Sequence, residues 1–193
     1  MAKKVIDKKP KKNQAKHSLK EDHHADVLAR YMSEISKIKP LLREEEIALA
    51  IQVKKSNTKA MQELVRRNLK YVITVANKFK GCGLSLQDLI EEGNIGLIQA
   101  AKRFDGDRNV KFITYAVWWI RQAIMHALAE QAGTVRLPIK QAGKLYKINR
   151  KYKTMSQILE REPTPTEVAS GLGLQEDDME TVMRAYRTHV SLD

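Results

Sequence analysis

Aromatic and cationic side chains cluster in the middle of the chain. The two tryptophans of the protein, Trp118 and Trp119, are adjacent and follow Tyr115, and Arg108 and Arg121 flank them. Aromatic rings stack on nucleic-acid bases with about 1–3 kcal/mol per base, and arginine side chains add cation–π contacts to such rings. These residue types at this spacing predict a surface that binds unpaired nucleotides.

A single helix is expected to position this cluster. A turn over residues 105–109 precedes it, and from about Val110 to Gln131 the apolar residues recur at helical spacing. The aliphatic face is expected to lie in the core: Ile113, Ala116, Val117, Ile120, Ile124 and Ala127. The opposite face carries aromatic and polar residues: Lys111, Phe112, Tyr115, Trp118, Trp119, Gln122 and His126. A helix that is apolar all round is often simply buried, but lysine, glutamine and histidine are poor core residues, which favours an exposed functional face.

An acidic stripe forms a second candidate surface. Ser85 is the predicted N-cap of a helix in which Asp88, Glu91, Glu92 and Ile95 follow the spacing i, i+3, i+4 and i+7 of one face. Taken alone, such a stripe is usually a solvated face of the protein. In a strongly basic chain it is also a candidate surface for a protein partner.

The overall charge points to a polyanionic partner. The 193 residues carry a net charge of +12 and an isoelectric point of about 9.7, which favours nucleic acid over the weaker alternative of an anionic membrane surface. The lysine-rich residues 1–24 contain little that can be buried, so disorder is expected there. The single cysteine, Cys82, excludes an internal disulfide and fits a reducing cytoplasm. No apolar run reaches the roughly 18 residues that span a membrane, and no secretory signal is expected.

No sequence pattern indicates catalysis. The chain shows no glycine-rich phosphate loop with its lysine, no nucleophile triad, and no cluster of histidine and carboxylate residues at metal-ligand spacing. We therefore expect a binding protein rather than an enzyme, with no metal and no cofactor.

Helical patterns account for the rest of the chain. Helices are expected over residues 25–38, 41–55, 59–80, from 85, 110–131, 140–160, from 165 and over 175–187. Thr164, Pro165 and Glu167 form a helix start signal with a capping box. The expected fold is all-α. A basic tail (1–24) precedes a helical bundle (25–132), a linker (133–138) and a small three-helix domain (139–193).

Two runs carry a close resemblance to a known family. DLIEEGNIGL at residues 88–97 and KFITYAVWWIRQAI at residues 111–124 resemble the second conserved region of bacterial RNA polymerase sigma factors of the primary, housekeeping-like class. The resemblance extends from about residue 26 to the end of the chain, and residues 139–193 resemble the third sigma domain. It implies a helical protein that binds core RNA polymerase and the −10 element of promoter DNA.

The resemblance also implies roles for individual residues. A flipped adenine of the non-template strand would enter a pocket formed by Phe104, Arg108, Thr114, Tyr115 and Trp118. Trp119 would wedge against the last paired step, and Gln122 would read the upstream edge of the element. Lys111 would hold backbone phosphate, and Phe112 would also belong to the DNA-binding residues. A second base pocket would involve Met32, Glu44, Glu46 and Asn68. The polymerase contact, with a basic coiled coil of the largest subunit, would be made by Asp88, Glu91, Glu92, Asn94 and Ile95.

Energetics predict that the chain does not open DNA alone. Two captured bases contribute about 2–6 kcal/mol, whereas about ten base pairs of stacking cost on the order of 14 kcal/mol. Core polymerase is therefore expected to supply further contacts. The sequence shows no domain that would read the −35 element. A truncated sigma-like regulator that competes for core polymerase, or a general single-strand DNA-binding module, are the alternatives to a promoter-recognition subunit.

Overall fold

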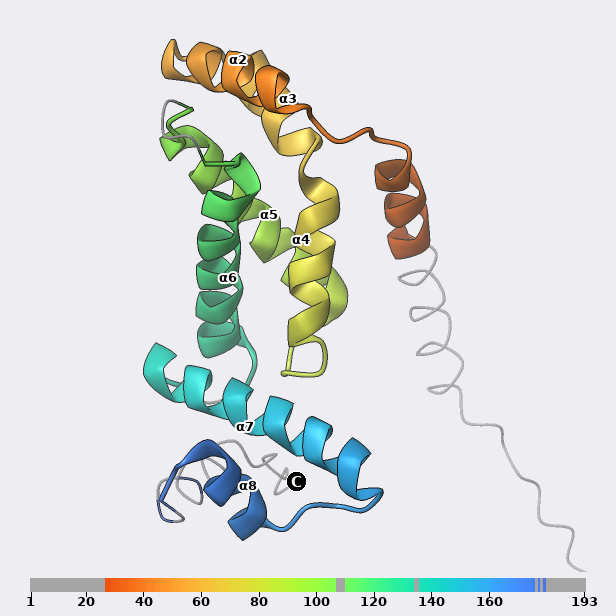
Figure 1. Cartoon of the computed structure of the whole chain (residues 1–193), viewed down its shortest axis with the longest axis vertical. Coiled ribbons are helices and arrows are strands. Elements are labelled where there is room, and N and C mark those ends of the chain that lie inside the picture. The colour runs from red at the N-terminus through yellow and green to blue at the C-terminus, as the bar shows by residue number, and fades with distance from the viewer. Residues whose placement is uncertain (1–26, 107–109, 134–135, 176, 178, 180–193) are drawn as a thin grey trace, which may run out of the picture. The chain divides into compact units, whose positions relative to one another are not determined.

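The computed structural model describes residues 27–106, 110–133 and 136–175, together with Asp177 and Met179. Within these ranges all regular structure is helical, which confirms the all-α prediction (Figure 1). The chain forms two compact units, Met1–Lys39 and Pro40–Asp193. The first contains a helix over residues 27–36. The basic tail of residues 1–24 lies outside the described residues.

The second unit contains the helices that carry the candidate sites. In chain order they are α2 (Arg43–Lys54), α3 (Thr58–Arg66), α4 (Leu69–Ala76), the short 3₁₀ helix η1 (Asn77–Phe79), α5 (Leu86–Arg103), α6 (Phe112–Gln131), α7 (Ile139–Leu159) and α8 (Pro165–Leu172). The α4, α5 and α6 helices pack against one another, and α7 packs against both α6 and α8 (Figure 1). The helix expected over residues 175–187 falls largely outside the described residues.

The long helix expected over residues 59–80 is instead interrupted, so that prediction was wrong. Its first part ends at Arg66 and a new helix begins at Leu69. Asn68, between them, has φ −110° and ψ 0°, and its side-chain Nδ2 donates a hydrogen bond of 2.8 Å to the carbonyl oxygen of Leu64. Asparagine side chains satisfy backbone groups in this way and so compete with a continuous helix. The apolar period continues across the break, which is why the sequence pattern did not reveal it.

The core of the second unit lies where α5 packs against α6. Leu97 of α5 and Ile120 and Ile124 of α6 are fully buried. Gly96 allows the backbones to approach closely, because a Cβ atom added there would lie 2.6 Å from the carbonyl oxygen of Trp119. Phe112 is also fully buried, so the expectation that it lies on the exposed aromatic face was wrong. The buried stripe of α6 begins at this residue and continues one turn at a time through Ala116, Ile120, Ile124 and Ala127.

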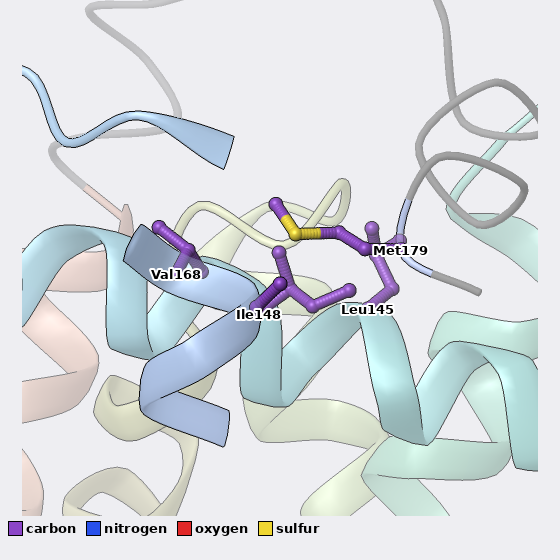
Figure 2. Packing of buried hydrophobic residues seen from close by; sticks show 5 residues of the cluster. Leu145, Ile148, Val168 and Met179 are labelled. Atoms are coloured by element: carbon purple, nitrogen blue, oxygen red, sulfur yellow. The ribbon is translucent and has the colours of Figure 1, made fainter. Parts of the chain in front are cut away.

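A smaller apolar cluster holds α7 and α8 together. Leu145 and Ile148 of α7 pack with Val168 and Ala169 of α8 and with Met179 (Figure 2). The α7 helix also contacts η1 and the turn that follows it. The rings of Phe79 and Tyr146 stack with centroids 4.5 Å apart, and Lys153 Nζ donates a hydrogen bond of 3.1 Å to the carbonyl oxygen of Lys80.

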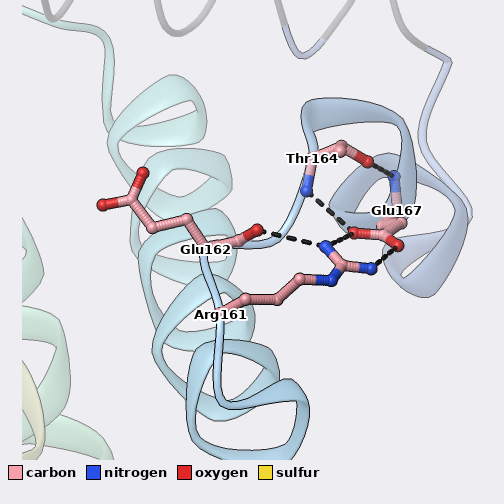
Figure 3. A network of polar contacts seen from close by, with 4 residues as sticks. All are labelled: Arg161, Glu162, Thr164 and Glu167. Carbon is pink, nitrogen blue, oxygen red and sulfur yellow. Dashed lines mark hydrogen bonds and ion pairs between the residues drawn. The ribbon is translucent and has the colours of Figure 1, made fainter.

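The start of α8 matches the predicted capping box. The Thr164 hydroxyl accepts a hydrogen bond from the Glu167 amide, and a Glu167 carboxylate oxygen accepts one of 2.8 Å from the Thr164 amide (Figure 3). Both oxygens of the same carboxylate accept hydrogen bonds from Arg161, at 2.7 and 3.1 Å. The hydrogen bonds from Arg161 and Thr164 lower the pKa of the Glu167 carboxyl to about 2.

This carboxylate makes the stability of the chain depend on pH. The pKa of this carboxyl group is about 2 in the folded protein, against an ordinary value of 4.5. Its contribution to the free energy of unfolding is therefore complete above about pH 4.5 and is lost as the pH falls toward 2. We expect the free energy of unfolding to fall less over this pH interval in Glu167→Gln than in the wild type. Urea unfolding at a series of pH values measures the difference. Glu162→Gln is the matched control, because that side chain lies away from the network (Figure 3). An unchanged pH profile in Glu167→Gln would contradict the assignment.

Candidate nucleic-acid interface

A connected series of aromatic rings runs from the core to the surface at the N-terminal half of α6. The ring of Phe112 contacts that of Phe104 at a centroid distance of 5.0 Å, and Phe104 contacts Tyr115 at 5.9 Å. Tyr115 in turn contacts Trp119 at 6.1 Å. The first two rings are buried, whereas Tyr115 and Trp119 are half-buried. Tyr115 and Trp119, at the outer end of the series, are therefore held in place by rings of the core.

A cavity of about 380 Å³ lies beside this series. Its lining comes from the end of α5, the following loop and one face of α6: Arg103, Phe104, Asp105, Val110, Thr114, Tyr115 and Trp118. The predicted pocket residues Phe104, Thr114, Tyr115 and Trp118 are thus brought together around one space. The fifth predicted member, Arg108, lies outside the described residues. Aromatic rings with hydroxyl groups among them provide both stacking surface and hydrogen-bonding capacity for a nucleobase.

The two tryptophans differ in their exposure and in their cationic neighbours. Trp118 is 70% exposed and Trp119 is half-buried. The guanidinium carbon of Arg121 lies 5.7 Å from the ring centroid of Trp118, and that of Arg103 lies 4.6 Å from the ring of Trp119. A guanidinium within about 6 Å of an indole ring is attracted to its face. Each tryptophan ring therefore has a cation beside it.

Sequence reasoning missed Arg103 as a member of this site. It stands directly before Phe104, at the end of α5, and lines the cavity. Asp105 and Val110 of the same lining were also not predicted as site residues. Their position in the connection between Phe104 and α6 could have identified them, because binding residues often lie in loops beside the elements of a site.

Most of the remaining predicted contacts of α6 lie at the surface. Lys111, the N-cap residue, and Gln122 are exposed. They lie on the same helix as the cavity-lining residues, one near its start and one midway along it. Phe112 is fully buried and offers no surface for a nucleotide. It acts as packing beneath Phe104.

The four residues of the predicted second base pocket are divided between the two units. Met32 belongs to the first unit, whereas Glu44, Glu46 and Asn68 belong to the second. Glu44 is exposed, and the amide group of Asn68 is engaged with the backbone of Leu64.

Glu46 has surroundings unlike those of an exposed base-contacting residue. It is 9% exposed, and it is the buried charged residue of the described part of the chain. Its carboxylate accepts a hydrogen bond from the backbone amide of Phe112. Burial raises the pKa of this carboxyl group, while that hydrogen bond and the cations Lys111 and Arg43 act in the opposite direction.

The acidic stripe of α5 lies at the surface. Asp88, Glu91 and Ile95 are exposed, with Ile95 at 50%, and Glu92 and Asn94 are half-buried. Ser85 caps the helix as predicted, its hydroxyl accepting a hydrogen bond of 3.1 Å from the Asp88 amide. Gln131, at the end of α6, donates a hydrogen bond of 3.1 Å to Glu92. The stripe therefore presents carboxylates and one apolar side chain together at the surface.

A metal-binding cluster and a membrane-spanning helix are both absent from the described residues. No group of three or more histidine, cysteine or carboxylate side chains is arranged to hold a metal ion in that part of the chain. In the same ranges, no helix combines the length and the apolar character that crossing a membrane requires.

Comparison with known proteins agrees with this geometry. Three family models match successive parts of the chain: Sigma-70 factor, region 1.2 (residues 26–57), Sigma-70 region 2 (64–134) and Sigma-70 region 3 (143–193). The match to region 2 includes α4, α5, α6 and the cavity between the last two. The match to region 1.2 includes α2.

Curated relatives of the chain are RNA polymerase sigma factors. The RNA polymerase sigma factor SigA of Clostridium acetobutylicum is 40% identical over 168 residues, which are 87% of this chain and 44% of that protein. The SigA proteins of a Bacillus species and of Listeria monocytogenes are 38% and 36% identical over the same length, covering 45% of each relative. The chain thus spans less than half the length of these relatives. With regions 1.2, 2 and 3 matched in order, the chain belongs to the sigma-70 family of RNA polymerase sigma factors.

Proposed function

We propose that this chain is a promoter-recognition subunit of bacterial RNA polymerase that captures the unpaired non-template strand of the −10 element. The observation that carries the proposal is the cavity beside α6, whose lining combines Phe104, Tyr115 and Trp118 with the hydroxyl of Thr114. A base flipped out of a duplex needs a pocket that offers stacking on its face and hydrogen bonds to its edge. This cavity supplies both kinds of contact.

The exposed indole of Trp118 and the half-buried indole of Trp119 have different roles in capturing the strand. The cavity takes a flipped adenine, with Trp118 as one of its walls. Trp119, which contacts the tilted ring of Tyr115 and has the Arg103 guanidinium over its face, occupies the position vacated by that base and abuts the last paired step. Lys111 and Gln122 act on the backbone phosphate and on the upstream edge of the element. Phosphate contacts set the register, whereas base contacts set sequence preference.

The proposal requires core RNA polymerase as a partner. Capturing two bases contributes about 2–6 kcal/mol, whereas opening about ten pairs costs on the order of 14 kcal/mol. The exposed carboxylates Asp88 and Glu91 and the half-buried Glu92, with Asn94 and Ile95, form the surface that docks a basic coiled coil of the largest polymerase subunit. The action is binding rather than enzymatic catalysis, and it takes place in the cytoplasm, where the polymerase is.

Reversing the charge of the acidic stripe tests the polymerase contact. We expect Asp88→Arg combined with Glu92→Arg to weaken core binding by at least about tenfold, because two attractive pairs become repulsive at a desolvated interface. Run-off transcription from an extended −10 promoter should fall with it. Glu160→Arg combined with Glu162→Arg is the matched control, since it makes the same charge change at exposed positions after α7.

The outcomes separate the alternatives. Core binding that is unaffected by the reversal would contradict the proposal and favour a general single-strand DNA-binding module. Core binding that depends on Asp88 and Glu92, but with no transcript from the wild-type chain, would favour a sigma-like competitor for core polymerase. Transcription by the wild-type chain, lost on charge reversal and kept in the control, supports promoter recognition.

A further inference from the structure

One face of α2 contacts two residues that follow α5 and the first residue of α6. Glu46, Ala50 and Lys54 are spaced four residues apart and therefore lie on one face of the helix. The first meets Phe112, the second meets Gly106 and the third meets Asp105. Asp105 also lines the cavity, as does Val110 before α6.

Glu46 supplies the start of α6 with an acceptor that α6 itself lacks. The first amides of a helix have no partner within the helix and need one from outside it. The N-cap residue, Lys111, makes no side-chain capping hydrogen bond. The carboxylate of Glu46 accepts from the Phe112 amide instead, and a negative charge at this end of a helix also suits the helix dipole. The α2 helix therefore caps α6 across the fold.

The middle contact depends on the absence of a side chain. A Cβ atom at Gly106 would lie 2.9 Å from the Cβ of Ala50 and 3.7 Å from the Cα of Ile47. Two small residues thus let the backbone at Gly106 lie directly on the surface of α2. Larger side chains at either position would displace that backbone from the helix.

The third contact is an ion pair made by a residue that lines the cavity. Lys54 Nζ lies 2.5 Å from an Asp105 carboxylate oxygen, with 47% and 38% of the two side chains exposed. Asp105 itself lines the cavity. The ammonium group of Lys54 offsets the negative charge of this carboxylate, which would otherwise repel an anionic strand.

We propose that Glu46, Ala50 and Lys54 of α2 are positioning residues that set the geometry of the base pocket without touching the base. In this assignment Glu46 orients the start of α6, and Lys54 holds the wall that contains Asp105. The inference rests on the proposed capture of an unpaired adenine, and it gives Glu46 a role at the start of α6 in addition to the contact in the second base pocket that the resemblance implies. Asp105 belongs to the wall, and Gly106 and Phe112 lie next to it or below it, so the three contacts restrain the shape of the pocket. A fixed shape is what discriminates one base from another.

The first test measures the anchor without DNA. In the full chain, Glu46→Ala is expected to accelerate hydrogen exchange of the Phe112 amide by about tenfold, because a hydrogen bond to a charged acceptor is lost. Glu46→Gln keeps an oxygen that accepts from the same amide and should retain most of the protection. Equal exchange in the wild type and in Glu46→Ala would overturn the anchor.

The second test measures base discrimination with a short single-stranded DNA of −10 sequence. The quantity is the ratio of affinities for the oligonucleotide with adenine and for the same strand with cytosine at the flipped position. Lys54→Gln should lower this ratio by up to about fivefold, as expected for a partly exposed ion pair, and Lys54→Arg should restore it. Lys55→Gln is the matched control, since it removes the same charge from the adjacent exposed residue.

The two proposals fail in different ways. A wild-type chain with no adenine preference would overturn the proposed base capture and this inference with it. A wild-type preference that falls equally in Lys54→Gln and Lys55→Gln would leave base capture standing and overturn the positioning role alone, because the effect would then be general attraction between lysine and phosphate. A fall in Lys54→Gln that Lys54→Arg reverses, with Lys55→Gln unchanged, supports the positioning role.

Discussion

Replacing both Trp118 and Trp119 with alanine is expected to abolish capture of the melted strand while leaving the helical fold near that of the wild type. At about 1–3 kcal/mol per stacked base, loss of two stacking surfaces lowers the affinity for a forked −10 DNA by at least about thirtyfold. The fold should survive because Trp118 is 70% exposed and Trp119 is half-buried, outside the packed stripe of α6. Binding is measured by fluorescence anisotropy and helix content by circular dichroism.

Conservative variants show whether the rings themselves are responsible. Trp118→Phe and Trp119→Phe retain an aromatic face and should keep part of the affinity. Ile158→Ala is the control for loss of exposed apolar surface, since Ile158 is 73% exposed at the far end of α7. A double alanine variant that loses most of its helix content would show that the rings belong to the core. One that folds and still binds forked DNA with wild-type affinity would contradict the proposed function.

Substituting Gly96 with alanine is expected to give the largest loss of stability among the small substitutions of the chain. The added Cβ would lie 2.6 Å from the Trp119 carbonyl oxygen and 2.9 Å from both the Ile120 Cα and the Ala123 Cβ. Backbone atoms of α6 cannot move aside as a flexible side chain can, so α5 and α6 must separate. Overpacking of this kind costs about 1–3 kcal/mol, which exceeds the gain of up to about 1 kcal/mol from replacing glycine within a helix.

A second glycine in a helix provides the matched control. A Cβ at Gly143 of α7 would meet nothing closer than Met125 Cε at 3.7 Å, an ordinary contact distance. Gly143→Ala should therefore be neutral or stabilising by up to about 1 kcal/mol. Both variants are compared with the wild type by urea unfolding. Equal unfolding free energies for Gly96→Ala and Gly143→Ala would show that α5 and α6 are not in close backbone contact.

The elements that the sequence predicted well are those in which local chemistry and pattern agree. Ser85, Thr164 and Pro165 are strong helix start signals, and the structure places a helix start at each. Adjacent indoles flanked by arginine are poor core material, and Trp118 lies at the surface. Such features are decided by neighbours in the chain, so they are visible without knowledge of the fold.

The features that the sequence did not predict depend on residues distant in the chain. Phe112 fits either face of α6 by its position, and its burial depends on the packing partner Phe104. The anchoring of α6 comes from Glu46 on another helix, which no spacing within α6 can reveal. Arg103 becomes part of the site only because the end of α5 meets the indole of Trp119. These are tertiary contacts, and a pattern of one residue type along one helix contains no information about them.

The ring series from Phe112 to Trp119 has a thermodynamic consequence. Because Phe104 and Phe112 are buried and each ring leans on the next, Tyr115 and Trp119 have lost much of their rotamer freedom when the protein folds. An incoming nucleotide then meets rings that are already arranged, so association loses little further side-chain entropy at this surface. The entropy cost of ordering these rings therefore falls on folding and not on the binding of a single strand.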